Sequence, residues 1–209
     1  MKKIIVVIIC AFISLNVSAQ KADKGWKSLF NGKSFKGWSF SENPDSFSIE
    51  DGVVKVEGPR SHMFYTGKYK KHDFKNFELK MQVKTMPGAN SGIFVHTEFE
   101  EDGWPSKGYE IQVNQTQGDW RKTGSVYSFK DVKETFVKDN EWYTQHIIVQ
   151  GDDITVKING EVINEFNEKT DRGEMGDSGK RLSHGTVALQ AHDPKSVVYY
   201  KDIMIKPLP

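Results

Sequence analysis

The residues best suited to chemistry occupy the polar faces of two predicted strands, residues 90–98 and 108–114. Apolar and polar side chains alternate in both segments, which is typical of half-buried strands because successive side chains point to opposite faces. A solvated sheet face tends to carry lysine, threonine and serine, whereas these faces carry a histidine, two carboxylates, two amides and an aromatic ring. The side chains are Phe94, His96, Glu98, Glu110, Gln112 and Asn114. We interpret them as the floor of a site that binds and transforms a polyol.

Several common catalytic devices are absent from the sequence. No His-Glu-x-x-His or paired-cysteine spacing indicates zinc, no glycine-rich loop opens a helix for phosphate, and no Gly-x-Ser-x-Gly elbow is present. An ordinary glycosidase needs two carboxylates across the scissile bond. The residue two positions beyond Glu110 is Gln112, which disfavours that mechanism, although Glu98 on the neighbouring strand could supply the second carboxylate. A histidine–carboxylate cluster can also hold a divalent metal, which the spacing neither requires nor excludes.

The elements that must position these residues are short strands. Residues 186–192 alternate again, with Gln190 and His192 on the face opposite Val187 and Leu189. No segment of helical length shows helical spacing, and the strands are separated by turn dipeptides of the hairpin type. Examples of these dipeptides are Asn31-Gly32, Asp51-Gly52 and Asn159-Gly160. This pattern predicts an all-β sandwich of two antiparallel sheets.

Three further candidate ligand contacts lie in predicted loops. Arg60 follows a Gly-Pro turn, Trp104 lies in the loop that joins the two polar strands, and Tyr127 lies in the polar segment 115–140. That segment is long for a connection and has weak periodicity, which favours a binding loop over a plain linker. The charged, glycine-rich segment 167–184 is a second predicted loop. Trp104 is placed to stack on a sugar face, and Arg60 and Tyr127 are candidates for the rim of the site.

The pattern of residues 1–19 is typical of a signal peptide. Two lysines precede an apolar run over residues 4–15, and small residues at 17–19 form a cleavage site after Ala19. The run is too short to span a bilayer, and its Cys10 fits a lipoprotein signal poorly, so no membrane anchor is expected. We expect a periplasmic or secreted protein whose mature chain lacks cysteine.

Residues 20–209 have the length of a single domain with a sizeable core. The whole chain has 29 Lys plus Arg against 28 Asp plus Glu, so no net electrostatic field attracts nucleic acid or anionic lipid. The charge balance thus indicates no partner, and the expected small-saccharide ligand rests on the polar strand faces; the oligomeric state is not specified.

Five stretches, taken in order, resemble the concanavalin-like family described as 3-keto-disaccharide hydrolases, or 3-keto-glucoside 1,2-lyases and 3-keto-2-hydroxyglucal hydratases. They are Ser28-Leu29-Phe30-Asn31-Gly32 with Gly37-Trp38; Asn90-Ser91-Gly92-Ile93-Phe94; Gly108-Tyr109-Glu110-Ile111-Gln112; Glu141-Trp142 with residues 154–160; and residues 185–192 with the closing strand. The resemblance covers roughly residues 25–207 and implies a concanavalin-like jelly-roll sandwich for the single domain. Segments 115–140 and 167–184 lie outside the strong motifs, which leaves the sugar and the linkage open.

The resemblance implies cleavage of a 3-keto-glycoside by elimination. A ketone at C3 makes the hydrogen on C2 acidic, and the group at C1 can leave from the resulting enolate. Adding water to the enone then yields the free 3-keto sugar. This chemistry needs a base near C2, donors for the enolate oxygen and an acid for the departing oxygen. One carboxylate and one histidine meet these needs, so Gln112 is compatible with the mechanism.

On this basis Glu110 is the expected base, and His192 or His96 is the expected acid and enolate partner. The expected substrate-binding residues are Asn90, Gln112, Gln190, Trp104, Tyr127 and Arg60. The chemistry demands no cofactor, and a divalent metal is left open. Two alternatives also stay open. One is a non-catalytic carbohydrate-binding module that holds sugar on Trp104 or Trp120, and the other is an ordinary two-carboxylate glycosidase.

Overall fold

The computed structural model describes residues 24–172 and 180–209. The signal peptide expected over residues 1–19 lies outside this part of the chain, as do residues 173–179 of the second predicted loop. Within the described ranges, no helix combines the length and the apolar character needed to cross a membrane.

The described residues form thirteen strands and two short 3-10 helices. The strands are β1 (Lys27–Ser28), β2 (Trp38–Phe40), β3 (Phe47–Glu50), β4 (Val53–Val56), β5 (Ser61–Tyr65), β6 (Phe77–Thr85), β7 (Asn90–Thr97), β8 (Tyr109–Asn114), β9 (Tyr143–Gln150), β10 (Asp153–Ile158), β11 (Glu161–Asn167), β12 (Thr186–Ala191) and β13 (Val198–Pro207). The helices are η1 (Pro44–Ser46) and η2 (Tyr69–His72).

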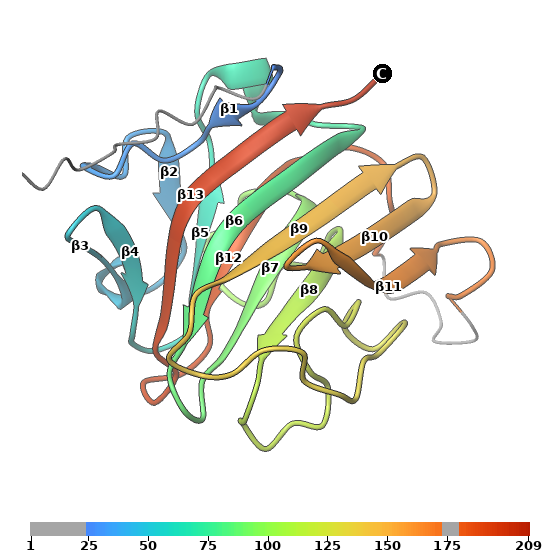
Figure 1. Cartoon of the computed structure of the whole chain (residues 1–209). Helices are drawn as coiled ribbons and strands as arrows, with labels where there is room; N and C mark the ends of the chain where they lie inside the picture. The colour runs from blue at the N-terminus through green and yellow to red at the C-terminus, as the bar shows by residue number, and fades with distance from the viewer. Residues whose placement is uncertain (1–23, 173–179) are drawn as a thin grey trace, which may run out of the picture.

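The strands build two antiparallel sheets that form two layers (Figure 1). The larger sheet has eight strands in the order β11-β10-β9-β6-β13-β4-β3, with β1 paired to β13. The smaller sheet has five strands in the order β2-β5-β12-β7-β8. This arrangement confirms the predicted all-β sandwich. It also places β5 and β12 in the same sheet as β7 and β8, although β5 lies well before β7 in the sequence and β12 lies well after β8.

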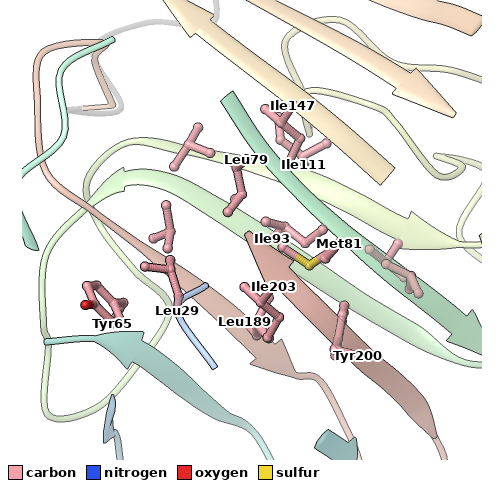
Figure 2. Packing of buried hydrophobic residues seen from close by; sticks show 14 of the residues in the cluster. Leu29, Tyr65, Leu79, Met81, Ile93, Ile111, Ile147, Leu189, Tyr200 and Ile203 are labelled. Carbon is pink, nitrogen blue, oxygen red and sulfur yellow. The ribbon is translucent and has the colours of Figure 1, made fainter. Parts of the chain in front are cut away.

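The hydrophobic core fills the space between the two sheets. One face of each central strand supplies it, as the alternation predicted, and Figure 2 shows Ile93, Ile111 and Leu189 of the smaller sheet within this layer. All three side chains are at most 2% exposed. Burying one such aliphatic side chain contributes about 1.5–3 kcal/mol. The core therefore stabilises the sandwich and leaves the outer face of the smaller sheet free for polar residues.

Two of the three predicted hairpin turns are confirmed. Asp51-Gly52 joins the paired strands β3 and β4, and Asn159-Gly160 joins β10 and β11. The hairpin at Asn31-Gly32 is wrong, because β1 pairs with β13 in the larger sheet while β2 pairs with β5 in the smaller one. The chain passes between sheets there. Turn residues encode a reversal of direction, but they do not encode the partner of the next strand.

Candidate active site

The outer face of the smaller sheet carries its side chains in cross-strand rows. The first row consists of Phe64, Ala188, Phe94 and Glu110, on β5, β12, β7 and β8. The second row consists of His62, Gln190, Gly92 and Gln112 on the same four strands. The pairs His62–Gln190 and Gly92–Gln112 are direct, and the β12–β7 register places Gln190 beside Gly92, one step beyond Leu189–Ile93. The second row therefore has a gap at Gly92, next to Glu110.

A cavity of about 410 Å³ lies over these rows, within the size range of small-ligand sites. Its lining consists of Asn90, Phe94, Trp104, Pro105, Glu110, Gln112, Tyr127, Lys180, Gln190 and His192. The predicted site residues in this lining are Asn90, Trp104, Glu110, Gln112, Tyr127, Gln190 and His192. The tertiary structure thus brings together most of the side chains that alternation and loop position had predicted, whereas His96 and Arg60 are not part of the lining.

Glu110 extends from the edge strand β8 across Gly92. A Cβ atom at Gly92 would lie 2.3 Å from Glu110 Oε1, so the carboxylate occupies the space of the missing side chain. Gln190 Nε2 donates a hydrogen bond of 3.0 Å to the same oxygen. Burial raises the pKa of Glu110 to about 7, although the hydrogen bond from Gln190 and the charge of Lys180 oppose the rise. A carboxylate with this pKa is matched to proton transfer near neutral pH.

His192 follows β12 directly and is held by an acidic neighbour. Its Nδ1 lies 2.7 Å from Asp193 Oδ2, and Ser196 Oγ donates a hydrogen bond of 2.8 Å to the same carboxylate oxygen. Burial alone would raise the pKa of Asp193, but the hydrogen bonds from His192 and Ser196 outweigh it and keep that pKa below its usual value. An ionised Asp193 favours the proton on Nδ1 of His192. Nε2 is then the nitrogen that can exchange a proton with a ligand.

Two glutamine side chains on the floor of the cavity each have an acceptor atom without a hydrogen-bond partner among the described residues. Gln112 Nε2 donates a hydrogen bond of 3.0 Å to Asn90 Oδ1, and Gln190 Nε2 is engaged by Glu110. The Oε1 atoms of Gln112 and Gln190 are buried and have no hydrogen-bond partner among the described residues. An unpaired buried acceptor costs about 1–3 kcal/mol. Both glutamines line the cavity, so each unpaired acceptor belongs to a residue that a bound sugar can contact.

Lys180 is a cavity residue that the sequence pattern did not reveal. Its Nζ donates a hydrogen bond of 2.9 Å to the Pro105 carbonyl oxygen and lies 5.7 Å from the centre of the Phe94 ring. Burial lowers the pKa of Lys180, while the nearby Glu110 carboxylate opposes the shift. The ammonium group has three donors, so it can also bind a ligand oxygen. Lys180 belongs to the charged segment 167–184, where no periodicity separates one lysine from its neighbours.

The prediction that His96 lies on the polar face is wrong. Its ring packs 5.6 Å from that of Phe77 in the core, Nε2 lies 2.8 Å from the Lys75 carbonyl oxygen, and the Ser183 amide donates to Nδ1 at 3.1 Å. His96 has a φ of 53°, and the β12–β7 register shifts between Thr186 and Val187. This is a β-bulge, which reverses the alternation at one residue. With both ring nitrogens engaged outside the cavity, His96 is not available as the acid.

The second carboxylate required by an ordinary glycosidase is also missing from the cavity. Glu98 forms an ion pair with Lys107 and lines a separate hollow of about 250 Å³. Among the described residues that line the main cavity, Glu110 is the only acid. The described residues contain no group of three or more His, Cys, Asp or Glu side chains arranged to hold a metal ion.

Two of the remaining loop candidates, Trp104 and Tyr127, form walls of the cavity, and Arg60 supports one of them. Trp104 lies over the floor, and Arg60 supports it from outside the cavity, with its guanidinium carbon 5.3 Å from the indole centre. Arg60 is itself bound to both carboxylate oxygens of Glu42, at 2.7 and 3.0 Å. Tyr127 lines the opposite part of the cavity next to β8, and Arg121 stacks on its ring at 4.8 Å. Arg60 therefore positions a wall residue rather than forming the rim.

Comparisons with known proteins are consistent with this site. Residues 25–206 match the family of the 3-keto-alpha-glucoside-1,2-lyase-like domain. A relative from Bacteroides thetaiotaomicron, named 3-keto-disaccharide hydrolase, is 39% identical over 77 residues. That match covers 34% of this chain and only 27% of the relative.

Solved structures share the sandwich. A candidate glycosyl hydrolase from Parabacteroides distasonis superposes with a TM-score of 0.75 at 25% identity, over 88% of this chain and 94% of the other. The carbohydrate-binding module CBM66 from Bacillus subtilis has a TM-score of 0.51 at 11% identity, over 87% and 95% of the two chains. At that identity the second likeness concerns the fold alone.

Proposed function

The chain belongs to the 3-keto-alpha-glucoside-1,2-lyase-like domain family, and from this premise we propose that it cleaves 3-keto-glycosides by elimination followed by hydration. The observation that carries the proposal is the position of Glu110. It is a carboxylate with a pKa of about 7 that shares one cavity with His192, Lys180 and two amides with unpaired acceptors. The expected substrate is a 3-keto-disaccharide or a related 3-keto-glycoside.

In the first step, the Glu110 carboxylate takes the proton from C2 of the keto sugar. The electron pair of the broken C–H bond moves into the C3 carbonyl group and forms an enolate. Positive charge near the developing oxyanion stabilises it in a site shielded from water. Among the described residues of the cavity lining, Lys180 is the one that carries an ammonium group, so we assign the C3 oxygen to Lys180. The amide groups of Asn90 and Gln112 then hold the sugar hydroxyls.

In the second step, the enolate re-forms the ketone and expels the oxygen substituent at C1. The departing oxygen takes a proton from Nε2 of protonated His192, which the Asp193 carboxylate keeps oriented through Nδ1. The product is a 3-keto-2-hydroxyglucal, in which C1 and C2 are joined by a double bond. Neutral His192 can next accept a proton from water as it adds to C1, while Glu110 returns its proton to C2. The net reaction is hydrolysis of the glycosidic bond.

The decisive assay uses the purified protein and 3-keto-trehalose or a 3-keto-glucoside. Substrate loss, enone absorbance and release of the free 3-keto sugar are followed together, because enone accumulation separates elimination from hydration. Glu110→Gln keeps the shape of the side chain but removes the base, so we expect a loss of at least about 100-fold in kcat. Glu98→Gln is the matched control, since Glu98 lies outside the cavity, and it should retain wild-type kcat.

Two results would replace this proposal with one of the alternatives. Saturable sugar binding without turnover, unaffected by Glu110→Gln, would indicate a carbohydrate-binding module. Hydrolysis of an unoxidised disaccharide at a rate similar to that of its 3-keto form would indicate an ordinary glycosidase. We further propose that the protein acts after export, in the periplasm or outside the cell, following removal of residues 1–19.

A further inference from the structure

His62 is a buried histidine that the proposed reaction does not use. Its side chain is 0% exposed, and neither ring nitrogen has a hydrogen-bond partner among the described residues. Aromatic rings surround it instead, with ring-centre distances of 5.3 Å to Phe94, 5.6 Å to Trp104 and 6.0 Å to Phe64. Leaving a buried donor and a buried acceptor unpaired is unfavourable. A phenylalanine would suit these neighbours better, so a purely structural role does not explain the imidazole.

The position of His62 connects it to the cavity. It lies directly opposite Gln190 in the same cross-strand row that ends at Gln112. Three strand spacings separate β5 from β8, which makes the row about 14 Å long. One pyranose ring covers only part of that length. Trp104 lines the cavity and its ring packs 5.6 Å from that of His62, which is not itself part of the lining.

Trp104 is the wall residue in contact with His62. It is 47% exposed although it contacts His62, His192 and Arg60 through its ring. The loop that carries it is tied to the rest of the protein on both sides of the indole. The Glu42 amide donates to the Glu101 carbonyl oxygen on one side, and Lys180 binds Pro105 on the other. A ligand that reaches His62 from the cavity must displace the Trp104 indole, which can turn about its own side-chain bonds while the loop stays in place.

We propose that His62 and Trp104 form the subsite for the leaving-group sugar, in which the indole turns aside and a sugar hydroxyl binds the His62 imidazole. This inference rests on the proposed function, because the order of the residues follows the reaction. The keto sugar lies by Glu110 and the amides, His192 lies at the scissile oxygen, and Trp104 is the next ring beyond it, 5.5 Å from His192.

The chemistry of His62 fits a neutral hydroxylated ligand. Burial lowers the pKa of His62 to about 4, so the ring is uncharged near neutral pH. Neutral imidazole has one donor and one acceptor, which is the combination that a pair of sugar hydroxyls can satisfy. The groups facing it are the rings of Phe64, Phe94 and Trp104. The titratable groups farther out are Glu42, Arg60, Lys180 and His192. A sugar aglycone is thus favoured over a charged or a purely apolar one.

The kinetic experiment compares His62→Phe with wild type on two substrates, a 3-keto-disaccharide and the methyl 3-keto-glucoside. His62→Phe should lower kcat/KM for the disaccharide at least about tenfold more than for the methyl glycoside, because only the disaccharide has a sugar to lose contact with. His146→Phe, on the opposite sheet, is the control and should not discriminate between the substrates. Equal losses on both substrates for His62→Phe would overturn the proposal, because they would show a structural role.

A binding experiment separates this proposal from the proposed function. In Glu110→Gln protein labelled with 15N-histidine, the His62 ring signals, assigned by their loss in His62→Phe, should shift when unoxidised trehalose or the 3-keto-disaccharide binds. The methyl glycoside should leave them in place. A shift in the Glu110→Gln protein, combined with no turnover of the 3-keto-disaccharide by the wild type, would retain the subsite and reject the enzymatic reaction. Unmoved His62 signals at saturating disaccharide would reject the subsite, even if the enzyme is active.

Discussion

At the scale of single residues, the site depends on one carboxylate whose environment disfavours its charge. Glu110 is surrounded by protein atoms and keeps only a partial contact with solvent through the cavity. Its charge is balanced by the hydrogen bond from Gln190 and by the ammonium of Lys180. These two groups therefore tune the base, and replacing either should alter the pH dependence of the reaction.

The pH profile provides a test of this tuning. Since Glu110 must be ionised to act as a base, the rising limb of the wild-type kcat/KM profile should have its midpoint near pH 7. In Lys180→Met the positive charge that favours the carboxylate is lost, so the pKa of Glu110 and the midpoint should move upward. Initial rates between about pH 5 and pH 9 would measure both profiles.

A control variant and two possible outcomes make the role of Lys180 testable. Lys130→Met removes an exposed lysine paired with Asp171 outside the cavity and should leave the midpoint unchanged. If Lys180→Met lowers kcat without moving the midpoint, Lys180 acts on the enolate alone. If it changes neither, Lys180 has no part in the reaction.

The same pKa shift predicts an effect on stability. The folded pKa of about 7 lies above the ordinary value of 4.5, so the folded protein binds this proton more tightly than the unfolded chain does. Below about pH 4.5 the carboxyl group is protonated in both states and does not lower the free energy of unfolding. Ionisation of Glu110 lowers that free energy progressively as the pH rises through 7, by about 3 kcal/mol in total. Glu110→Gln should raise the free energy of unfolding at pH 8 but not at pH 4.5. Urea denaturation of both proteins at the two pH values measures the difference, and an equal gain at both pH values would contradict the assignment.

At the scale of elements, the hollow exists because β7 carries a glycine in the middle of its polar face. Gly92 lies between Gln190 and Gln112, and the Glu110 side chain crosses it. Gly92 does not have a positive φ, so its backbone needs no glycine. Glycine is needed at this position because any side chain would occupy the space that the Glu110 carboxylate fills.

Gly92→Ala tests this requirement. The new Cβ would lie 2.3 Å from Glu110 Oε1, so the carboxylate must move away from C2 of the substrate, and we expect kcat to fall by at least about 100-fold. The fold should persist, because the group that must move is the end of a flexible side chain. Gly118→Ala is the matched control, since a Cβ there meets no atom within 4 Å. Circular dichroism would confirm that both variants are folded, and an active Gly92→Ala enzyme would disprove the role of this gap.

The bulge in β7 is the second decisive feature at this scale. Gly108 packs against it so closely that a Cβ would lie 2.0 Å from the Val95 carbonyl oxygen, and its φ is +71°. The bulge turns His96 into the core and lets the strand end against the loop that carries Trp104. The loop can therefore fold back over the sheet and wall the cavity.

At the scale of the whole molecule, stability and function depend on different surfaces of the two-layer sandwich (Figure 1). The core between the sheets supplies the apolar burial, and the outer face of the smaller sheet carries the polar side chains that line the cavity. Polar groups with unpaired atoms, such as His62 and the two glutamines, are tolerated there because they lie outside this core. Replacing them by apolar residues should stabilise the protein while weakening sugar binding, a common exchange between stability and activity.

Residues 1–19 give one prediction at this scale. When residues 1–209 are expressed in a Gram-negative host, we expect export and cleavage after Ala19, so that the processed protein begins at Gln20. Cell fractionation and intact-mass measurement test both parts. A cytoplasmic product that retains the apolar run over residues 4–15 would contradict the prediction.

The sequence alone determined the local features of this protein. Alternation with a period of two assigned Glu110, Gln112, Gln190 and His192 to an outer face, because that period follows from the geometry of a single strand. The all-β class and most of the turns followed for the same reason. Motif order then indicated the family and, with it, the chemistry expected of these side chains.

The tertiary structure alone decided which of these side chains meet. The order β2-β5-β12-β7-β8 depends on pairing between distant segments, and such pairing is set by burial across the whole core rather than by neighbouring residues. Contacts between segments far apart in the chain also decided three details of the site. They are the bulge that turns His96 away from the cavity, the position of Lys180 beside Pro105, and the packing of Trp104 against His62. A periodic pattern carries no information about such contacts, because it describes one strand at a time.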